Sequence, residues 1–222
     1  MADTSPAERL RTVQDGIERA ARLARRSPDQ VTLIAVCKTQ PASAITPLLD
    51  LGVRHFGENR VGEAQEKWPA LRAAYPDVKL HLVGQLQSNK AEEAAGLFDC
   101  IHSVDRPSLV EALARAMDKT GRRPDCFVQV NIGDEPQKGG CATADLPALL
   151  NGARALALPV VGLMCIPPAD VEPAPYFALL AKLAGRHGVP ALSMGMSGDY
   201  ETAVTIGATH VRIGTSLFGE RS

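Results

Sequence analysis

Short runs of apolar residues alternate with longer amphipathic stretches along the whole chain. The first run, 31–37 (VTLIAVC), shows no alternation of apolar and polar residues, which is typical of a strand covered on both faces in a parallel sheet. The stretches between such runs carry apolar residues at helical spacing. This order of strands and helices predicts an α/β fold built from βαβ units.

The pattern predicts eight strands, and each strand except the last is followed by a helical stretch. The predicted strands are 31–37, 52–57, 79–84, 100–104, 126–131, 160–165, 191–196 and 210–214. The predicted helices are 42–51, one through Trp68 and Leu71, 89–97, 107–117, 144–155, 175–187 and 200–206. Eight βα units indicate a single (β/α)₈ TIM barrel over residues 1–222. The alternative is an open doubly wound sheet, but no G-x-G-x-x-G follows the first strand.

An extra helix is predicted before the first strand, at about 6–26. Leu10, Val13 and Ile17 recur at helical spacing after Ser5 and Pro6, which is the pattern of an amphipathic helix with a start signal. Several arginines lie between the apolar positions. A solvated helix face explains them better than a surface that binds a polyanion.

Composition narrows the class of protein. With 45% hydrophobic residues, 22% charged residues and a net charge of −1, the chain has no electrostatic reason to bind nucleic acid or a membrane. No apolar run approaches the roughly 20 residues of a membrane span, and the polar start is no signal peptide. We therefore expect a cytoplasmic protein. The five scattered cysteines are expected to be small buried residues rather than disulfide partners or zinc ligands.

Lys38 is the first candidate for chemistry. It directly follows the first apolar run, and Pro41 then ends the strand because proline has no N–H to donate to a sheet. The carboxyl end of a buried parallel strand is where α/β proteins place their ligand sites. Partial burial there would favour a neutral, nucleophilic amine. The two alternatives are a Schiff-base lysine and an ammonium group that extends into water.

The last two units carry a candidate phosphate site. The segment 193–199 (SMGMSGD) places Ser197 and Gly198 before a helix, where a hydroxyl and backbone N–H groups would bind an anion. Gly214 and Thr215 follow the eighth strand, and the loops after strands seven and eight form the usual phosphate site of these barrels. The alternative is that Ser197 only caps a helix and Gly214 only turns a loop.

Other polar residues give weaker signals. Asn59, after the second strand, either faces the barrel mouth or caps the next helix. His81, within the third strand, is expected to be a hydrogen-bonded core histidine. The loop around Lys138 either holds an anion or is plainly solvated. The sequence has no HExxH and no GxSxG motif, so zinc hydrolysis and triad chemistry have no support and no metal site is expected.

A set of segments, taken in order, carries a resemblance to a known family. They are AVCKTQP, HFGENRVGEAQEK, HLVGQLQSNK, VNIGDEPQKGG, GLMCIPP, LSMGMSGD and VRIGTSLFGER. Through these motifs the chain from Val31 to Arg221 resembles the pyridoxal phosphate homeostasis protein family. The resemblance implies a single barrel like the N-terminal domain of alanine racemase, holding pyridoxal 5′-phosphate (PLP) as a Schiff base.

The resemblance also implies roles for single residues. Lys38 matches the lysine that carries PLP covalently, Asn59 the asparagine beside the cofactor, and Arg212 the arginine near the pyridine nitrogen. The positions that match the phosphate-binding residues are Ser197, Gly214 and Thr215. Together these six residues form the expected cofactor site.

Two positions depart from the family pattern. Gln137 stands where a serine usually precedes the lysine that matches Lys138, which leaves the role of Lys138 in a secondary site or in cofactor transfer open. Cys165 replaces a commoner alanine.

A second proton-transfer group of a racemase is not visible in the sequence. None of Tyr75, Tyr176 and Tyr200 lies at a clear strand end, and the sequence ends just after the eighth strand, so we expect no second domain and no two-base chemistry. The resemblance implies a protein that binds and buffers PLP with little turnover and passes it to apo forms of PLP-dependent enzymes. We expect a monomer or a weak dimer. The alternatives are a PLP-dependent racemase or decarboxylase of low activity, and a cofactor-free Schiff-base aldolase.

Overall fold

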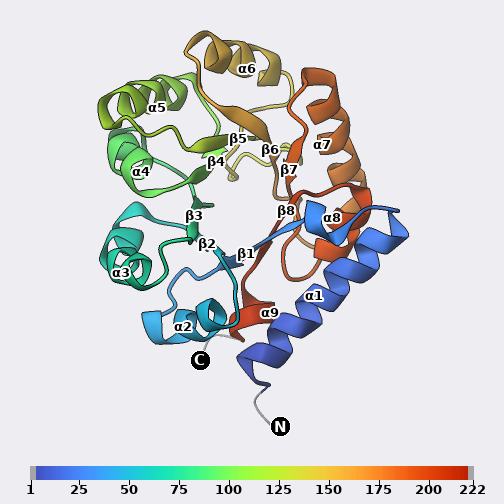
Figure 1. Cartoon of the computed structure of the whole chain (residues 1–222). Helices are drawn as coiled ribbons and strands as arrows, with labels where there is room; N and C mark the ends of the chain where they lie inside the picture. The colour runs from blue at the N-terminus through green and yellow to red at the C-terminus, as the bar shows by residue number, and fades with distance from the viewer. Residues whose placement is uncertain (1–3, 220–222) are drawn as a thin grey trace.

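The structure is a computed structural model of the chain and describes residues 4–219. Its parallel strands form one closed barrel in sequence order, as Figure 1 shows. The strands are β1 (Thr32–Val36), β2 (His55–Glu58), β3 (Lys79–Leu82), β4 (Cys100–Val104), β5 (Asp125–Gln129), β6 (Val160–Met164), β7 (Ala191–Ser193) and β8 (His210–Ile213). Because β8 pairs with β1 and closes the ring, the predicted TIM barrel is confirmed and the open sheet is excluded.

Helices surround the barrel and connect its strands (Figure 1). The α-helices are α1 (Pro6–Leu23), α2 (Ala42–Asp50), α3 (Val61–Ala74), α4 (Ala91–Leu97), α5 (Pro107–Thr120), α6 (Leu146–Ala155), α7 (Ala174–His187), α8 (Tyr200–Ile206) and α9 (Thr215–Phe218). Two short 3₁₀ helices, η1 (Pro28–Gln30) and η2 (Ser88–Lys90), precede β1 and α4. The predicted helices are all present, whereas α9, directly after the last strand, was not predicted.

Helix α1 is the predicted extra helix, and it packs beside α8 and α9 (Figure 1). Ser5 accepts a hydrogen bond from the Glu8 N–H, and the Glu8 carboxylate accepts one from the Ser5 N–H, so the start of the helix is held by a capping box. The helix ends at Leu23 rather than Arg26. Its buried face includes Leu10, Val13 and Ile17, as the periodicity predicted.

The hydrophobic core fills the space between the strands and the surrounding helices. All five cysteines are buried and free, so none of them forms a disulfide. Across residues 4–219, no helix combines the length and the apolar character needed to cross a membrane. The interior of the barrel differs from this hydrophobic core, because polar side chains lie along it. A cavity lies at each end of the barrel.

Candidate functional site

A cavity of about 320 Å³ lies at the carboxyl ends of the strands, and we call it the upper cavity. Its size and its mixture of apolar walls with a few polar groups are typical of a site for a small ligand. All six residues of the expected cofactor site line it. The lining residues are Val36, Lys38, Asn59, Val83, Ile166, Met196, Ser197, Gly198, Arg212, Gly214 and Thr215.

Lys38 lies in a turn two residues beyond β1. The backbone before it is fixed by the Cys37 N–H, which donates to the Gly57 carbonyl at 2.9 Å and so continues the pairing of β1 with β2. The next residue, Thr39, has φ +64°, a left-handed conformation that is uncommon for a residue with a branched side chain. Lys38 is therefore presented to the upper cavity by a sharply turned backbone rather than by the regular strand.

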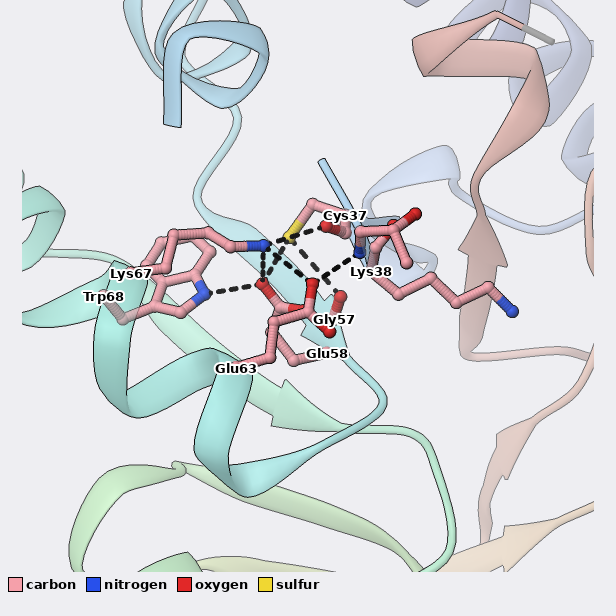
Figure 2. Close-up of polar contacts among 8 residues, drawn as sticks. Cys37, Lys38, Gly57, Glu58, Glu63, Lys67 and Trp68 are labelled. Atoms are coloured by element: carbon pink, nitrogen blue, oxygen red, sulfur yellow. Dashed lines mark hydrogen bonds and ion pairs between the residues drawn. The ribbon is translucent and has the colours of Figure 1, made fainter. Parts of the chain in front are cut away.

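A buried polar cluster holds this turn from the outside of the barrel, and Figure 2 shows it beside Lys38. We call it the Lys67 cluster; it comprises Glu58, Glu63, Lys67 and Trp68. The Lys67 ammonium donates to the Cys37 carbonyl at 3.1 Å. The Glu63 carboxylate accepts from the Thr39 N–H. The backbone is thus bound on both sides of Lys38, whose side chain extends away from the cluster (Figure 2).

Glu58 is the fully buried carboxylate of the Lys67 cluster. Its Oε1 accepts hydrogen bonds from Lys67 at 2.8 Å, from the Trp68 indole at 2.9 Å and from the Cys37 thiol at 3.2 Å. Burial raises the pKa of Glu58, although these donors oppose the shift. Burial alone would lower the pKa of Lys67, but the hydrogen bond and charge of Glu58, with Glu63, outweigh it and raise that pKa. The pair is best described as a buried ion pair in which each charge requires the other.

The predicted phosphate end forms around Ser197, which does not cap α8, the helix that follows it in the chain. Its hydroxyl oxygen instead accepts from the N–H groups of Gly214 at 3.3 Å and Ser216 at 3.4 Å, while Asp199 is the residue at the start of α8. Both contacts are longer than a normal N–H···O hydrogen bond. These N–H groups, with the hydroxyls of Ser197 and Thr215, therefore remain available to a stronger acceptor such as a phosphate oxygen.

Arg212 is a buried cation in the wall of the upper cavity, with 5% of its surface exposed. It donates from Nη1 to the Ser193 hydroxyl at 2.7 Å and from Nη2 to the Cys165 carbonyl at 2.9 Å. Both of these partners are neutral groups. Since a guanidinium has five N–H donors, others are left for an acceptor on a ligand. The predicted inward orientation of Arg212 in β8 is confirmed.

Of the other residues singled out in the sequence, Asn59 lines the upper cavity, whereas Lys138 and Cys165 do not. The start of α3 falls on Arg60 instead, so Asn59 is not a helix cap. Lys138 pairs with Glu135 and donates to a backbone carbonyl at 3.0 Å, and it does not line the cavity. The Cys165 carbonyl accepts a hydrogen bond from Arg212. Burial raises the pKa of the Cys165 thiol to about 12. The cavity lining within the described part of the chain includes no tyrosine.

Sequence reasoning missed the Lys67 cluster. Glu63 and Lys67 are an (i, i+4) pair on a helix, which is usually a weak pair on a solvated face. Glu58 follows an apolar strand and gives no sign that it is buried. The one available signal was the density of charged residues next to Trp68 in a segment that must pack against the barrel.

The chain is similar to known proteins over nearly its whole length. The chain matches the family model "Alanine racemase, N-terminal domain" over residues 12–222. It is 41% identical to a pyridoxal phosphate homeostasis protein of Pseudomonas aeruginosa, covering 97% of this chain and 95% of that protein. It is 38% identical to one of Aquifex aeolicus, covering 96% and 97%. The structure of PipY of Synechococcus elongatus PCC7942 with PLP bound superposes with a TM-score of 0.78, at 42% identity over 92% of this chain and all of that one.

Proposed function

The chain belongs to the pyridoxal phosphate homeostasis protein family, and we propose that it binds PLP in the upper cavity and takes part in intracellular PLP homeostasis. One observation carries the proposal. The 320 Å³ upper cavity is lined by the Lys38 amine, the buried Arg212 guanidinium and the hydroxyls of Ser197 and Thr215. Two N–H groups make only long contacts with the Ser197 hydroxyl. These are the groups that an aldehyde, a pyridine nitrogen and a phosphate require.

We propose that Lys38 carries PLP as a Schiff base, with Asn59 beside the ring. Ser197, Gly214 and Thr215 would bind the phosphate, and Arg212 would face the pyridine nitrogen. The two long N–H contacts of Ser197 support the phosphate end. The N–H groups of Arg212 that are not donated to Ser193 or Cys165 support its place beside the pyridine nitrogen.

We propose further that turnover is low. When bound, PLP supplies an electron sink for a carbanion at Cα of an amino acid, and it does so best when its ring nitrogen is protonated. Arg212 keeps a permanent positive charge in a buried wall, which raises the cost of a second positive charge beside it. The cavity lining between residues 4 and 219 also includes no histidine, tyrosine or carboxylate, so Lys38 has no visible partner for two-base proton transfer.

The cellular part of the proposal rests on the family. We propose that the protein acts in the cytoplasm as a monomer or weak dimer and passes PLP to apo forms of PLP-dependent enzymes. Mixing the loaded protein with such an apoenzyme, with a phosphatase present to destroy free PLP, tests transfer. Activation of the recipient supports direct passage, and no activation contradicts it.

Borohydride reduction followed by peptide mass mapping tests the central proposal. The purified protein should absorb in the visible, and reduction should fix a phosphopyridoxyl group on the peptide that contains Lys38. Lys38→Ala should abolish the covalent link and leave a folded barrel. A label on another lysine would contradict the assignment, and a colourless protein that captures a carbonyl substrate on Lys38 would support the aldolase alternative.

A further inference from the structure

The amino-terminal half of the barrel interior is lined by histidines. Four of the five histidines of the chain lie there, on neighbouring or facing strands. Their rings contact one another and Phe127. They are His55, His81, His102 and His210. Below them a second cavity of about 340 Å³, the lower cavity, opens at the end of the barrel opposite the upper cavity.

Cys100 joins two of these histidines. It lies directly opposite His81 in the pairing of β3 with β4, and it is two residues before His102, so their side chains leave the same face of β4. The Cys100 Sγ lies 3.2 Å from the His102 Nε2, and the His81 Nδ1 lies 3.0 Å from that same nitrogen. One ligand atom from each residue lies within 4.8 Å of the other two. All three side chains are buried.

Hydrogen bonding accounts for only one of the two short contacts of the His102 Nε2. A neutral imidazole nitrogen has either one hydrogen or one in-plane lone pair, so the His102 Nε2 can pair fully with only one of its two neighbours. A cation at the centre would accept lone pairs from all three atoms at once. Ligand atoms around a tetrahedral zinc are about 3.3–3.6 Å apart, by the usual zinc bond lengths, so small side-chain shifts would suffice.

We propose that His81, Cys100 and His102 form a zinc site, with water from the lower cavity as the fourth ligand. A thiolate with two imidazoles is a donor set that suits Zn²⁺. Binding forms a sulfur–zinc bond, and the thiol proton leaves to solvent through the lower cavity, which His81 and Cys100 line. Asp99, Asp125 and Lys79 line the same cavity. Because Asp99 is paired with Arg72 and Arg122, Asp125 is the carboxylate that favours the entry of a cation there.

The hydrogen-bond partners of the second ring nitrogens of His81 and His102 are consistent with a zinc site. The second nitrogen of His81 lies 2.9 Å from the His55 Nδ1, and the second nitrogen of His102 lies 2.8 Å from the Ser193 hydroxyl. Metal-binding histidines usually donate their other N–H to such an acceptor, which fixes the ring and its tautomer. The sequence-based expectation of no metal site did not weigh the Cys-x-His spacing in β4.

Cobalt substitution tests the site on the full chain, stripped of metal and free of PLP. We expect one Co²⁺ per chain, with visible bands of a four-coordinate ion, a near-ultraviolet sulfur-to-cobalt band, and displacement by Zn²⁺. Cys100→Ser should remove the sulfur band and weaken zinc binding by more than about a hundredfold, since loss of an outer-shell partner alone costs ten- to a hundredfold. The controls are Cys126→Ser, a buried cysteine on β5, and His210→Gln, and both should keep the band.

X-ray absorption of the zinc-loaded wild type needs no variant and so decides the matter even if Cys100→Ser fails to fold. We expect one sulfur at about 2.3 Å and nitrogen or oxygen at about 2.0–2.1 Å. No uptake of metal, or a shell without sulfur, would overturn the proposal. Because Lys38 and the phosphate-binding residues line the other cavity, failure of the zinc proposal would not contradict the proposal of PLP binding.

Discussion

Arg212 is the residue whose charge bears most directly on reactivity. Its guanidinium is buried and its partners, the Ser193 hydroxyl and the Cys165 carbonyl, are neutral. We predict that Arg212→Glu raises the rate of Cα hydrogen exchange of alanine in deuterated buffer, because a carboxylate stabilises a protonated pyridine nitrogen. Arg212→Gln, which keeps a donor for the Cys165 carbonyl, should give a smaller increase. Unchanged exchange in variants that still bind PLP covalently would contradict this electronic account.

Ser197 and Thr215 determine the preference for a phosphorylated ligand in our proposal. Each contact to the phosphate is a charge-assisted hydrogen bond worth about 1.5–3 kcal/mol, so each change to Ala should weaken PLP binding roughly tenfold to a hundredfold. Binding of unphosphorylated pyridoxal is the internal control and should change little. If wild type binds pyridoxal and PLP equally well, the phosphate site is wrongly placed.

Glu63 tests whether the Lys67 cluster positions Lys38. Glu63→Ala removes the acceptor of the Thr39 N–H and should slow covalent capture of PLP about tenfold, as misplacement of a nucleophile does. Glu63→Gln retains an acceptor and should restore most of the rate. Affinity for pyridoxine 5′-phosphate, which has no aldehyde, should be unaffected. Glu66→Ala, an exposed change on the same helix, is the control; equal slowing there would contradict a positioning role.

At the scale of single elements, Gly84 fixes the distance between two loops of the upper cavity. A Cβ atom at Gly84 would lie 2.2 Å from the Asn59 carbonyl oxygen. Gly84→Ala should therefore displace Asn59, cost about 1–3 kcal/mol through overpacking, and weaken PLP binding. Gly62→Ala, which meets no atom within 4 Å, is the control. Wild-type PLP affinity in Gly84→Ala would show that the place of Asn59 does not matter.

The strands were easier to predict from the sequence than the ends of the helices. The strands were predictable because both faces of a parallel strand are buried and the apolar runs stand out. Helix ends were less so: α5 continues to Thr120 and ends at Gly121, which has φ +68°, a position where glycine is free of strain. Helix α9 has only four residues, too few to show a period. His81 was expected to be a hydrogen-bonded core residue and is one.

What the sequence could not provide depends on register. The convergence of His81, Cys100 and His102 follows from the pairing of β3 with β4, and shifting one strand by a residue would turn its side chains to the other face. Likewise, that the six predicted residues share one cavity follows from closure of the barrel. The sequence motifs identified these six residues, but the distances between them depend on the closure of the barrel.

The histidines in the barrel interior predict that the fold loses stability in acid. Burial, then the positive field of His55 and Arg212, lowers the pKa of His210 to about 4, and burial lowers those of His81 and His102 well below their usual range. A pKa lower in the folded than in the unfolded state gives stability that is present above about pH 6.5 and is lost as pH falls towards the folded pKa. The barrel should therefore lose stability steadily from pH 6.5 to 4.

Chemical denaturation across this pH range, with a chelator present to exclude metal binding, measures the effect. His210→Gln cannot titrate, so its free energy of unfolding should fall less steeply, by up to about 3 kcal/mol over the range for one proton. His187→Gln, at the end of α7 outside the barrel, is the matched control and should follow the wild type. If His210→Gln keeps the full wild-type slope, proton uptake by the barrel interior is not what destabilises the fold in acid.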